Sequence, residues 1–221
     1  KNNLEKFTSN IVYLDCLPFY YYYKKQFKYP NNFKLYDNNN DNLLVFPGKM
    51  SFDKNSSDEF KKRKIYFEFI KEQKKDFSKI IVCIPRNESF FKEYIELINS
   101  FNFYYVTGPD PNDKNSYFRL LQILSLGNTV TTNCLGSIIV YAAVLSKKIS
   151  ISGPIYKPLR QFNNFYMPKN FDYSITEIKD EYKRIESIQF LKEKFSFLLF
   201  SNPSKSNTQL KWGLKEIGAE N

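Results

Sequence analysis

Residues 126–154 have the sequence LGNTVTTNCLGSIIVYAAVLSKKISISGP, which divides into a strand, a turn, a helix and a second strand. Residues 129–133 form a mostly β-branched run that favours a strand, and residues 138–145 are apolar on nearly every side, as in a buried helix. Gly136 and Ser137 lie at the start of that helix, where backbone N–H groups point outward and the helix dipole favours negative charge. This segment therefore predicts an anion site of the kind that holds a nucleotide phosphate.

Upstream, apolar strands alternate with helices in the same way. Strands are expected at residues 43–46, 80–84 and 103–107, each followed by proline or glycine, with a helix after each strand. Continuously apolar strands that alternate with helices are typical of a parallel sheet with helices on both faces. We therefore predict an α/β, Rossmann-like domain over residues 43–175, preceded at residues 1–42 by an irregular segment or inter-domain linker.

The last part of the chain, residues 176–221, is predicted to pack against this domain from outside the sheet. Apolar residues at helical spacing indicate one long helix over about residues 176–200 that crosses the domain. The tail after Pro203 is expected to be mobile, except that Trp212 docks on the domain.

The lack of histidine excludes several classes of site. None of the 221 residues is histidine, so the chain holds no Ser-His-Asp or Cys-His nucleophile system and no histidine metal site. Acid–base chemistry would fall to Asp, Glu, Lys, Tyr or Cys. The three cysteines, Cys16, Cys83 and Cys134, are widely spaced and form no CxxC pair. This pattern indicates a reducing compartment, so the expected location is the cytoplasm.

The chain is basic, with a net charge of +10 and a pI near 9.3. A basic surface can attract nucleic acid or anionic lipid. Lys, Asn, Tyr, Phe and Ile are all abundant, however, as the codon bias of an AT-rich genome would produce, and this is the favoured interpretation. No apolar run is long enough to cross a membrane. Peripheral contact with the inner face of a membrane stays open.

The candidate binding residues follow the predicted strands, because ligands of open α/β sheets bind beyond the carboxyl ends of the strands. Glycines, cations and an amide there suit a phosphate, although βα loops also need glycine and polar residues for their turns. The predicted phosphate contacts are Asn133, Gly136, Ser137, Gly48, Lys49 and Arg86. Gly108 and Pro109, after the strand at 103–107, are predicted to contact the nucleoside.

Several known phosphate and metal motifs are missing from the sequence. It has neither GxGxxG after the first strand nor GxxxxGK[ST], which argues against dinucleotide and P-loop sites. No DxD doublet stands at a strand end, so metal dependence is not supported. Asp110 and Asp113 in GPDPND are better explained as a rigid turn, because proline flanks Asp110 on both sides.

The order of these segments, from the strand ending in PG through YYVTG and FRLLQILSLGNTV to TTNCLGSIIVYAAVLSKKISISGP, resembles a known family. It is similar to the C-terminal half of bacterial capsule and lipopolysaccharide glycosyltransferases of GT-B architecture. The resemblance covers roughly residues 43–154. The positions that match the family's phosphate-binding turn and helix are Thr132, Asn133, Gly136, Ser137, Tyr141, Ala142, Lys147 and Lys148.

The resemblance implies one half of a GT-B enzyme, with a nucleotide-sugar donor as substrate and no cofactor. A glycan or lipid-linked acceptor is implied as the second substrate. Tyr141 lies near the position where retaining members carry a ribose-binding glutamate, so it is assigned to the nucleoside, and the stereochemical outcome stays open. The catalytic residues stay unknown, because the N-terminal domain usually supplies the base. Since the chain begins with Lys1, we expect that domain, or a homo-oligomer, to complete the enzyme.

Two alternatives remain. The first is a non-catalytic Rossmann-like scaffold module of a polysaccharide-assembly complex. The second and less favoured is a basic nucleic-acid-binding protein that uses the tyrosine- and lysine-rich N-terminal segment, although no RNP, helix–turn–helix or KH signature supports it.

Overall fold

The computed structural model describes residues 41–48, 57–86, 92–110, 112–155 and 188–219. Its strands are β1 (Asn42–Phe46), β2 (Lys79–Ile84), β3 (Tyr104–Thr107), β4 (Thr129–Thr132), β5 (Lys148–Ile151) and β6 (Asn207–Thr208). Its α-helices are α2 (Ser57–Glu72), α3 (Lys92–Ser100), α4 (Ser116–Leu124), α5 (Ser137–Val144), α7 (Ile188–Lys194) and α8 (Leu210–Glu216). Short 3-10 helices are η2 (Gln73–Asp76), η4 (Ser196–Leu198) and η5 (Pro203–Lys205).

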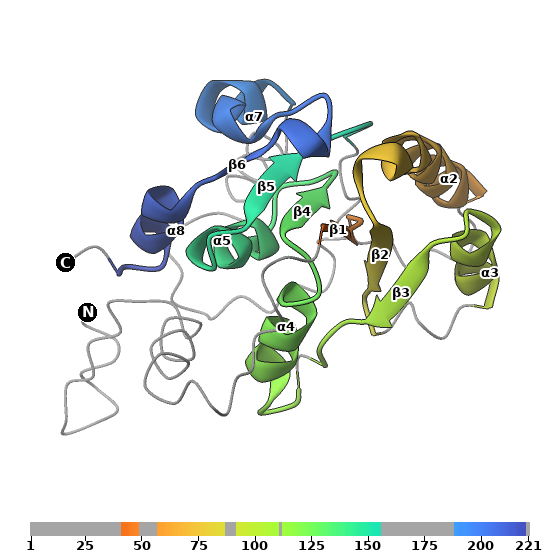
Figure 1. The fold of residues 1–221 in the computed structure, drawn as a ribbon, viewed down its shortest axis with the longest axis horizontal. Coiled ribbons are helices and arrows are strands. Elements are labelled where there is room, and N and C mark those ends of the chain that lie inside the picture. The colour runs from red at the N-terminus through yellow and green to blue at the C-terminus, as the bar shows by residue number, and fades with distance from the viewer. Residues whose placement is uncertain (1–40, 49–56, 87–91, 111, 156–187, 220–221) are drawn as a thin grey trace, which may run out of the picture.

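The strands form one six-stranded sheet in the order β3-β2-β1-β4-β5-β6 (Figure 1). β1 to β5 are parallel, and Leu44 in the central strand lies opposite Ile81 of β2 and Val130 of β4. The short β6 pairs with β5 in the antiparallel direction and ends the sheet. The prediction of an α/β, Rossmann-like sheet is therefore confirmed, and each predicted strand is present to within two residues.

Helices cover both faces of the sheet, as predicted. Side chains alternate along each strand, so neighbouring residues of β1 enter different cores. Leu43 and Val45 pack with Phe67 of α2 and with α3, whereas Leu44 packs with Ile139 of α5 and with α4. The two clusters bury apolar strand residues on both faces, as a parallel sheet requires.

The C-terminal part differs from the sequence-based expectation. The helix predicted over 176–200 ends at Lys194, and its first part lies outside the described residues. The chain then turns through η4, and Leu199 forms a parallel bridge with Ile151 of β5. Hydrogen bonding to the edge of β5 therefore overrides the helical spacing of the apolar residues.

The tail predicted to be mobile is folded. After Pro203 the chain forms η5, β6 and α8, and α8 packs on α5. Trp212 is half-buried and packs against the same cluster, which confirms its predicted docking. Gly213 makes the helix contact close, because a Cβ there would lie 2.7 Å from Ala143 Cβ and 2.8 Å from the Val144 backbone nitrogen.

Substitution of Gly213 by valine should detach or strain α8. We expect Gly213→Val to lower the free energy of unfolding by about 1–3 kcal/mol, as overpacking of a tight contact does. Urea denaturation measures this change. Gly136→Val is the matched control, because no atom of the described part of the chain lies within 4 Å of a Cβ at Gly136 and its backbone is extended, with φ −168°. Equal destabilisation by both variants would contradict the close α5–α8 contact.

Candidate functional site

The candidate site lies where the connections of the sheet diverge. From β1 the chain passes through α2 to β2 on one side, whereas β4 is followed by α5 and by β5 on the other side. Between the carboxyl ends of β1 and β4, the loops therefore separate and leave a crevice, which is the usual ligand position in open α/β sheets.

A pocket of about 610 Å³ opens at the carboxyl end of β1. It extends across the ends of β2 and β3 to α4, and it reaches α5 at Ser137, Ile138 and Tyr141. Its lining residues are Phe46, Pro47, Cys83, Pro85, Arg86, Gly108, Pro109, Asp110, Asn112, Leu120, Ser137, Ile138 and Tyr141. Five of the nine predicted contacts line it, namely Arg86, Gly108, Pro109, Ser137 and Tyr141.

The pocket is apolar inside and polar at its margin. Phe46, Leu120 and Pro85 contribute hydrocarbon surface, and the Cys83 thiol is buried beside them. Burial raises the pKa of Cys83 to about 12, although the charge of Arg119 opposes this shift. The thiol is therefore neutral at physiological pH, and this part of the pocket suits an uncharged or aromatic group.

Asn133 has a structural role that the sequence did not indicate. Its side chain is buried, and its Oδ1 accepts a 2.7 Å hydrogen bond from the backbone N–H of Gly48. The bond joins the ends of β1 and β4. Neither residue lines the pocket, and a Cβ at Gly48 would lie 3.1 Å from Cys134 Sγ. These two residues, both predicted as phosphate contacts, thus join the loops after β1 and β4 outside the lining of the pocket.

The helix N-terminus at Gly136 and Ser137 has the geometry that an anion site requires. Gly136 is the extended N-cap of α5, and no side chain in the described ranges makes a capping hydrogen bond at this end of the helix. Ser137 is exposed and lines the pocket. Among the described residues, no atom lies within 4 Å of a Cβ at Gly136, so neither their packing nor the backbone conformation requires glycine there. Since Ser137 lines the pocket, a ligand in the pocket can reach the first residue of the helix.

Tyr141 lines the pocket one helical turn after Ser137. Its ring meets Tyr117 of α4 edge to face, with 6.1 Å between the ring centroids. Burial raises the pKa of the Tyr141 hydroxyl, the nearby Tyr117 raises it further, and a hydrogen bond with Ser137 opposes the shift. The hydroxyl therefore stays protonated at neutral pH and can donate or accept a hydrogen bond at the pocket wall.

Arg86 is paired with a carboxylate at the margin of the pocket. Its Nη1 lies 3.5 Å from Asp110 Oδ2, and the Arg86 side chain is 56% exposed. Asp110 also accepts a hydrogen bond from the Asn112 backbone N–H, which supports the predicted rigid turn. The pair links the loops after β2 and β3. An anion in the pocket would compete with Asp110 for the guanidinium.

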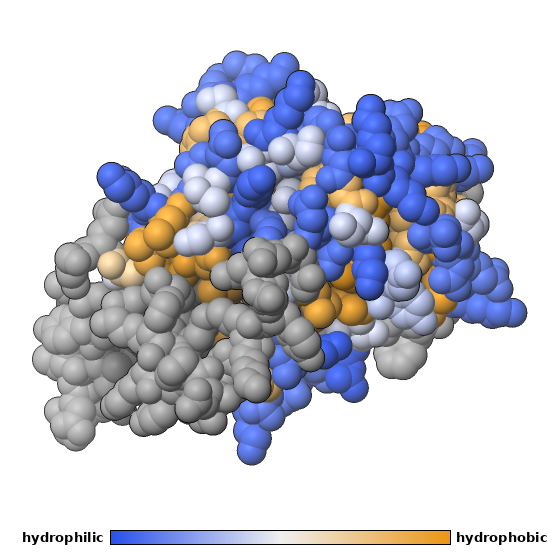
Figure 2. All heavy atoms as spheres, in the orientation of Figure 1, coloured by the Kyte–Doolittle hydropathy of each residue, from blue (hydrophilic) through white to orange (hydrophobic). Residues whose placement is uncertain are grey.

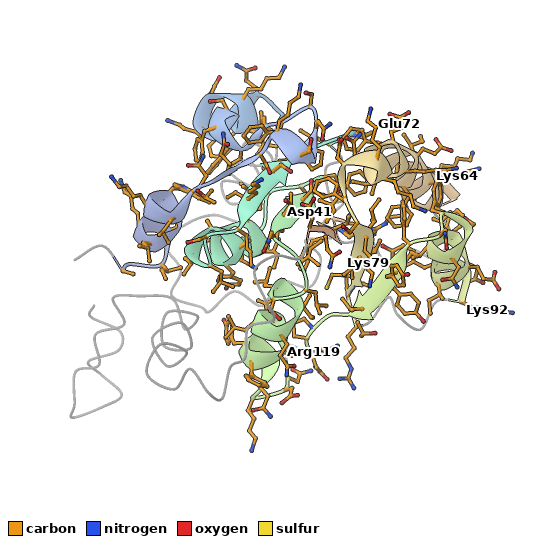
Figure 3. The ribbon with its side chains drawn as sticks, in the orientation of Figure 1. Asp41, Lys64, Glu72, Lys79, Lys92 and Arg119 are labelled. Carbon is orange, nitrogen blue, oxygen red and sulfur yellow. The ribbon has the colours of Figure 1, made fainter. Side chains whose placement is uncertain are left out.

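A second cation was missed by the sequence analysis. Arg119 of α4 donates a 3.5 Å hydrogen bond to the Thr107 carbonyl at the end of β3, and its charge acts on Cys83 (Figure 3). It is the fourth residue of α4, after the turn that contains Asp110 and Asp113, and the packing of α4 beside β3 brings it near the strand ends. The sequence pattern placed it in a helix and gave no signal that its side chain returns to the end of β3.

Lys49, Gly108 and the two lysines that match the family pattern have different positions. Lys49 lies outside the described residues. Gly108 donates a 2.7 Å hydrogen bond to the Ile84 carbonyl, so its small size also serves the close approach of two loops. Lys147 and Lys148, which match the family pattern, precede and begin β5 at the opposite end of the strand from its carboxyl end. They are therefore remote from the pocket.

Among the described residues, no group of three or more His, Cys, Asp or Glu side chains could hold a metal ion. In the same part of the chain, no helix is long and apolar enough to cross a membrane.

Comparison with known proteins finds no significant match. No family model matches the chain, no curated protein is significantly similar to it, and no solved structure matches it significantly. The function is therefore inferred from the pocket itself.

Removal of the Asn133 side chain should destabilise the domain. We expect Asn133→Ala to lower the free energy of unfolding by about 1–3 kcal/mol, because the Gly48 N–H loses its acceptor in a buried position. Chemical denaturation measures the change. Full stability in this variant would contradict the role of Asn133 in joining β1 to β4.

The buried Cys83 thiol should make stability depend on alkaline pH. Above its ordinary pKa of 9.0, the thiol ionises in the unfolded chain but stays protonated in the folded one up to about pH 12. The unfolded state therefore binds fewer protons, and the free energy of unfolding should fall by up to about 1.4 kcal/mol per pH unit in this range.

Comparison of the parent with Cys83→Ala isolates this effect, because the tyrosines titrate in both proteins. The difference in unfolding free energy between the two, measured in urea at several pH values above 9.0, should change with pH. A constant difference would show that the folded thiol ionises normally.

Proposed function

We propose that this domain binds the nucleotide part of a nucleotide-linked sugar and serves as the donor-binding half of a glycosyltransferase. The observation that supports this most directly is the combination of an apolar pocket with the open N-terminus of α5 at the diverging strand ends. A nucleotide has the same two parts, a flat base and a phosphate group, and Gly136 leaves room for the latter.

In this proposal the base enters the apolar part of the pocket near Leu120, Pro85 and the neutral Cys83. The phosphates then lie against the N–H groups at Ser137. Arg86 is within the same pocket margin and would exchange Asp110 for a phosphate oxygen. Tyr141 stands between these regions and offers its hydroxyl to the ribose.

The chemistry that follows is stabilisation of a leaving nucleotide. As the bond between the anomeric carbon and the phosphate oxygen breaks, negative charge develops on the phosphate. The dipole of α5 would stabilise it by about 0.3–1 kcal/mol for an exposed site. A charge-assisted hydrogen bond from Arg86 would contribute up to about 1.5 kcal/mol, because the guanidinium is solvated.

These groups do not supply proton transfer. Asp110 is the one carboxylate among the described lining residues, and it is engaged with Arg86. The base that activates the acceptor hydroxyl must then come from another part of the enzyme. The resemblance to GT-B enzymes supports the same division, since their N-terminal domain faces the donor domain across a cleft.

The test is a titration with UDP, GDP, CMP and ADP in which the free energy of unfolding of the chain is measured. A nucleotide at a hundred times its dissociation constant should raise the free energy of unfolding by about 2.7 kcal/mol. Gly136→Val should abolish that increase, because its side chain fills the space above the helix N-terminus. Without ligand, this variant should be as stable as the parent.

Matched variants separate the possible outcomes. Gly136→Ala should weaken binding less than Gly136→Val, since its side chain is smaller. If none of the four nucleotides stabilises the chain, the donor-binding proposal fails and the scaffold module becomes the better explanation. If Gly136→Val binds as tightly as the parent, the nucleotide does not contact the α5 N-terminus.

A further inference from the structure

A cluster of four aromatic rings lies on the C-terminal part of the chain, apart from the pocket. Phe190 and Phe195 meet edge to face with centroids 5.8 Å apart, and Phe197 meets Trp212 in the same way at 5.5 Å. Phe195 joins the two pairs, at 6.3 Å from both Phe197 and Trp212. The rings therefore form one continuous surface from α7 through η4 to α8, here called the aromatic surface.

The aromatic surface packs on buried leucines on its inner side and is partly exposed to solvent on its outer side. Leu191 and Leu198 alternate with its rings and are buried in the core. The rings themselves are only half-buried, and Phe197 is 38% exposed, as is Leu210 beside Trp212 at 37%. Phe195 and Trp212 pack with one side on the core cluster, and the parts of the rings that stay exposed form an apolar patch that folding leaves in contact with solvent.

Lysines border the aromatic surface. Between residues 188 and 219 there are five lysines and two glutamates, and all five lysines are exposed. Lys192 and Lys194 lie on α7 beside Phe195, and Lys211 and Lys215 lie one turn apart on α8 beside Trp212. Figure 2 shows hydrophobic patches bordered by hydrophilic surface over α7 and beside α8, and Figure 3 shows nitrogen-tipped side chains pointing outward from both helices.

From this combination we infer that the aromatic surface binds the interface of a lipid bilayer that contains anionic lipid. Phenylalanine and tryptophan rings partition into the headgroup region, where one side of the ring is apolar and the other wet. Lysine stems extend along the apolar surface while their ammonium groups reach lipid phosphates. The excess of lysine matches the negative charge of such a surface, which a purely apolar partner would not require.

The position of the aromatic surface is compatible with an occupied pocket. It lies beyond β5 and β6, at one edge of the sheet, whereas the pocket extends from α5 over the ends of β1, β2 and β3, and none of the four rings lines it. The aromatic surface and the pocket therefore use different side chains. The inference does not depend on the proposed function.

The experiment uses the full chain with vesicles of phosphatidylcholine, with and without phosphatidylglycerol. Trp212 is the one tryptophan in the sequence, so its fluorescence reports directly on this surface. Its emission should shift to shorter wavelength with the anionic vesicles and not with the neutral ones, and the chain should sediment with the former. High salt should release it.

Two variants test the surface itself. The double variant Lys211→Gln and Lys215→Gln should weaken binding to anionic vesicles by roughly 20-fold, at about fivefold for each lysine. Phe197→Ser should weaken it by roughly tenfold.

Matched controls lie at the opposite end of the molecule. Lys64→Gln with Lys92→Gln removes the same charge from α2 and α3 (Figure 3), and Tyr104→Ser removes a ring that is 59% exposed on β3. These variants should bind almost as the parent does. Equal loss in controls and surface variants, or equal binding to both kinds of vesicle, would overturn the inference. So would a dimer that Phe197→Ser dissociates, in the absence of vesicle binding, since the surface would then join two copies.

Discussion

The structure depends on the parallel pairing of β1 with both β2 and β4. This strand is buried on both faces, so its side chains form part of each core, and the connections that follow β1 and β4 run in opposite directions. The hydrogen bond from the Gly48 N–H to Asn133 Oδ1 continues the contact with β4 beyond the last paired residues. It holds the two loops at the separation that creates the pocket. The helix N-terminus at Gly136 then faces an open space.

The pocket combines two environments that the chain produces by different means. Its apolar part is an extension of the core, since Phe46, Cys83 and Leu120 come from elements that also pack the sheet. Its polar margin comes from the loops, which carry Arg86 and Asp110. Because the loops after β2 and β3 bring Arg86 and Asp110 together, an anion that contacts Arg86 must compete with the Asp110 carboxylate.

The C-terminal part shows how tertiary contacts override local spacing. Apolar residues continue at helical intervals past Lys194, which predicted one helix up to residue 200. In the structure, Leu198 enters the core and Leu199 pairs with the exposed side of β5. An edge strand has unpaired backbone groups, and the bridge at Leu199 with the hydrogen bond from the Phe200 N–H to the Ile151 carbonyl covers part of this edge. The same rearrangement leaves the aromatic rings on the surface and explains why the tail beyond Pro203 is folded.

The sequence by itself determined the order of the strands and helices from β1 to β5, the parallel sheet and the turn at Gly136, because these follow from apolar periodicity and from glycine and proline. It also determined that the chain has no histidine chemistry. Only the tertiary structure decided which of the predicted site residues line the same pocket. Asn133 and Gly48 are 85 residues apart, and local pattern does not distinguish a ligand contact from a bond between loops. Arg119 approaches the strand ends only through helix packing. Contacts between residues that are distant in sequence depend on how the helices and strands pack, so the local spacing of residues does not predict them.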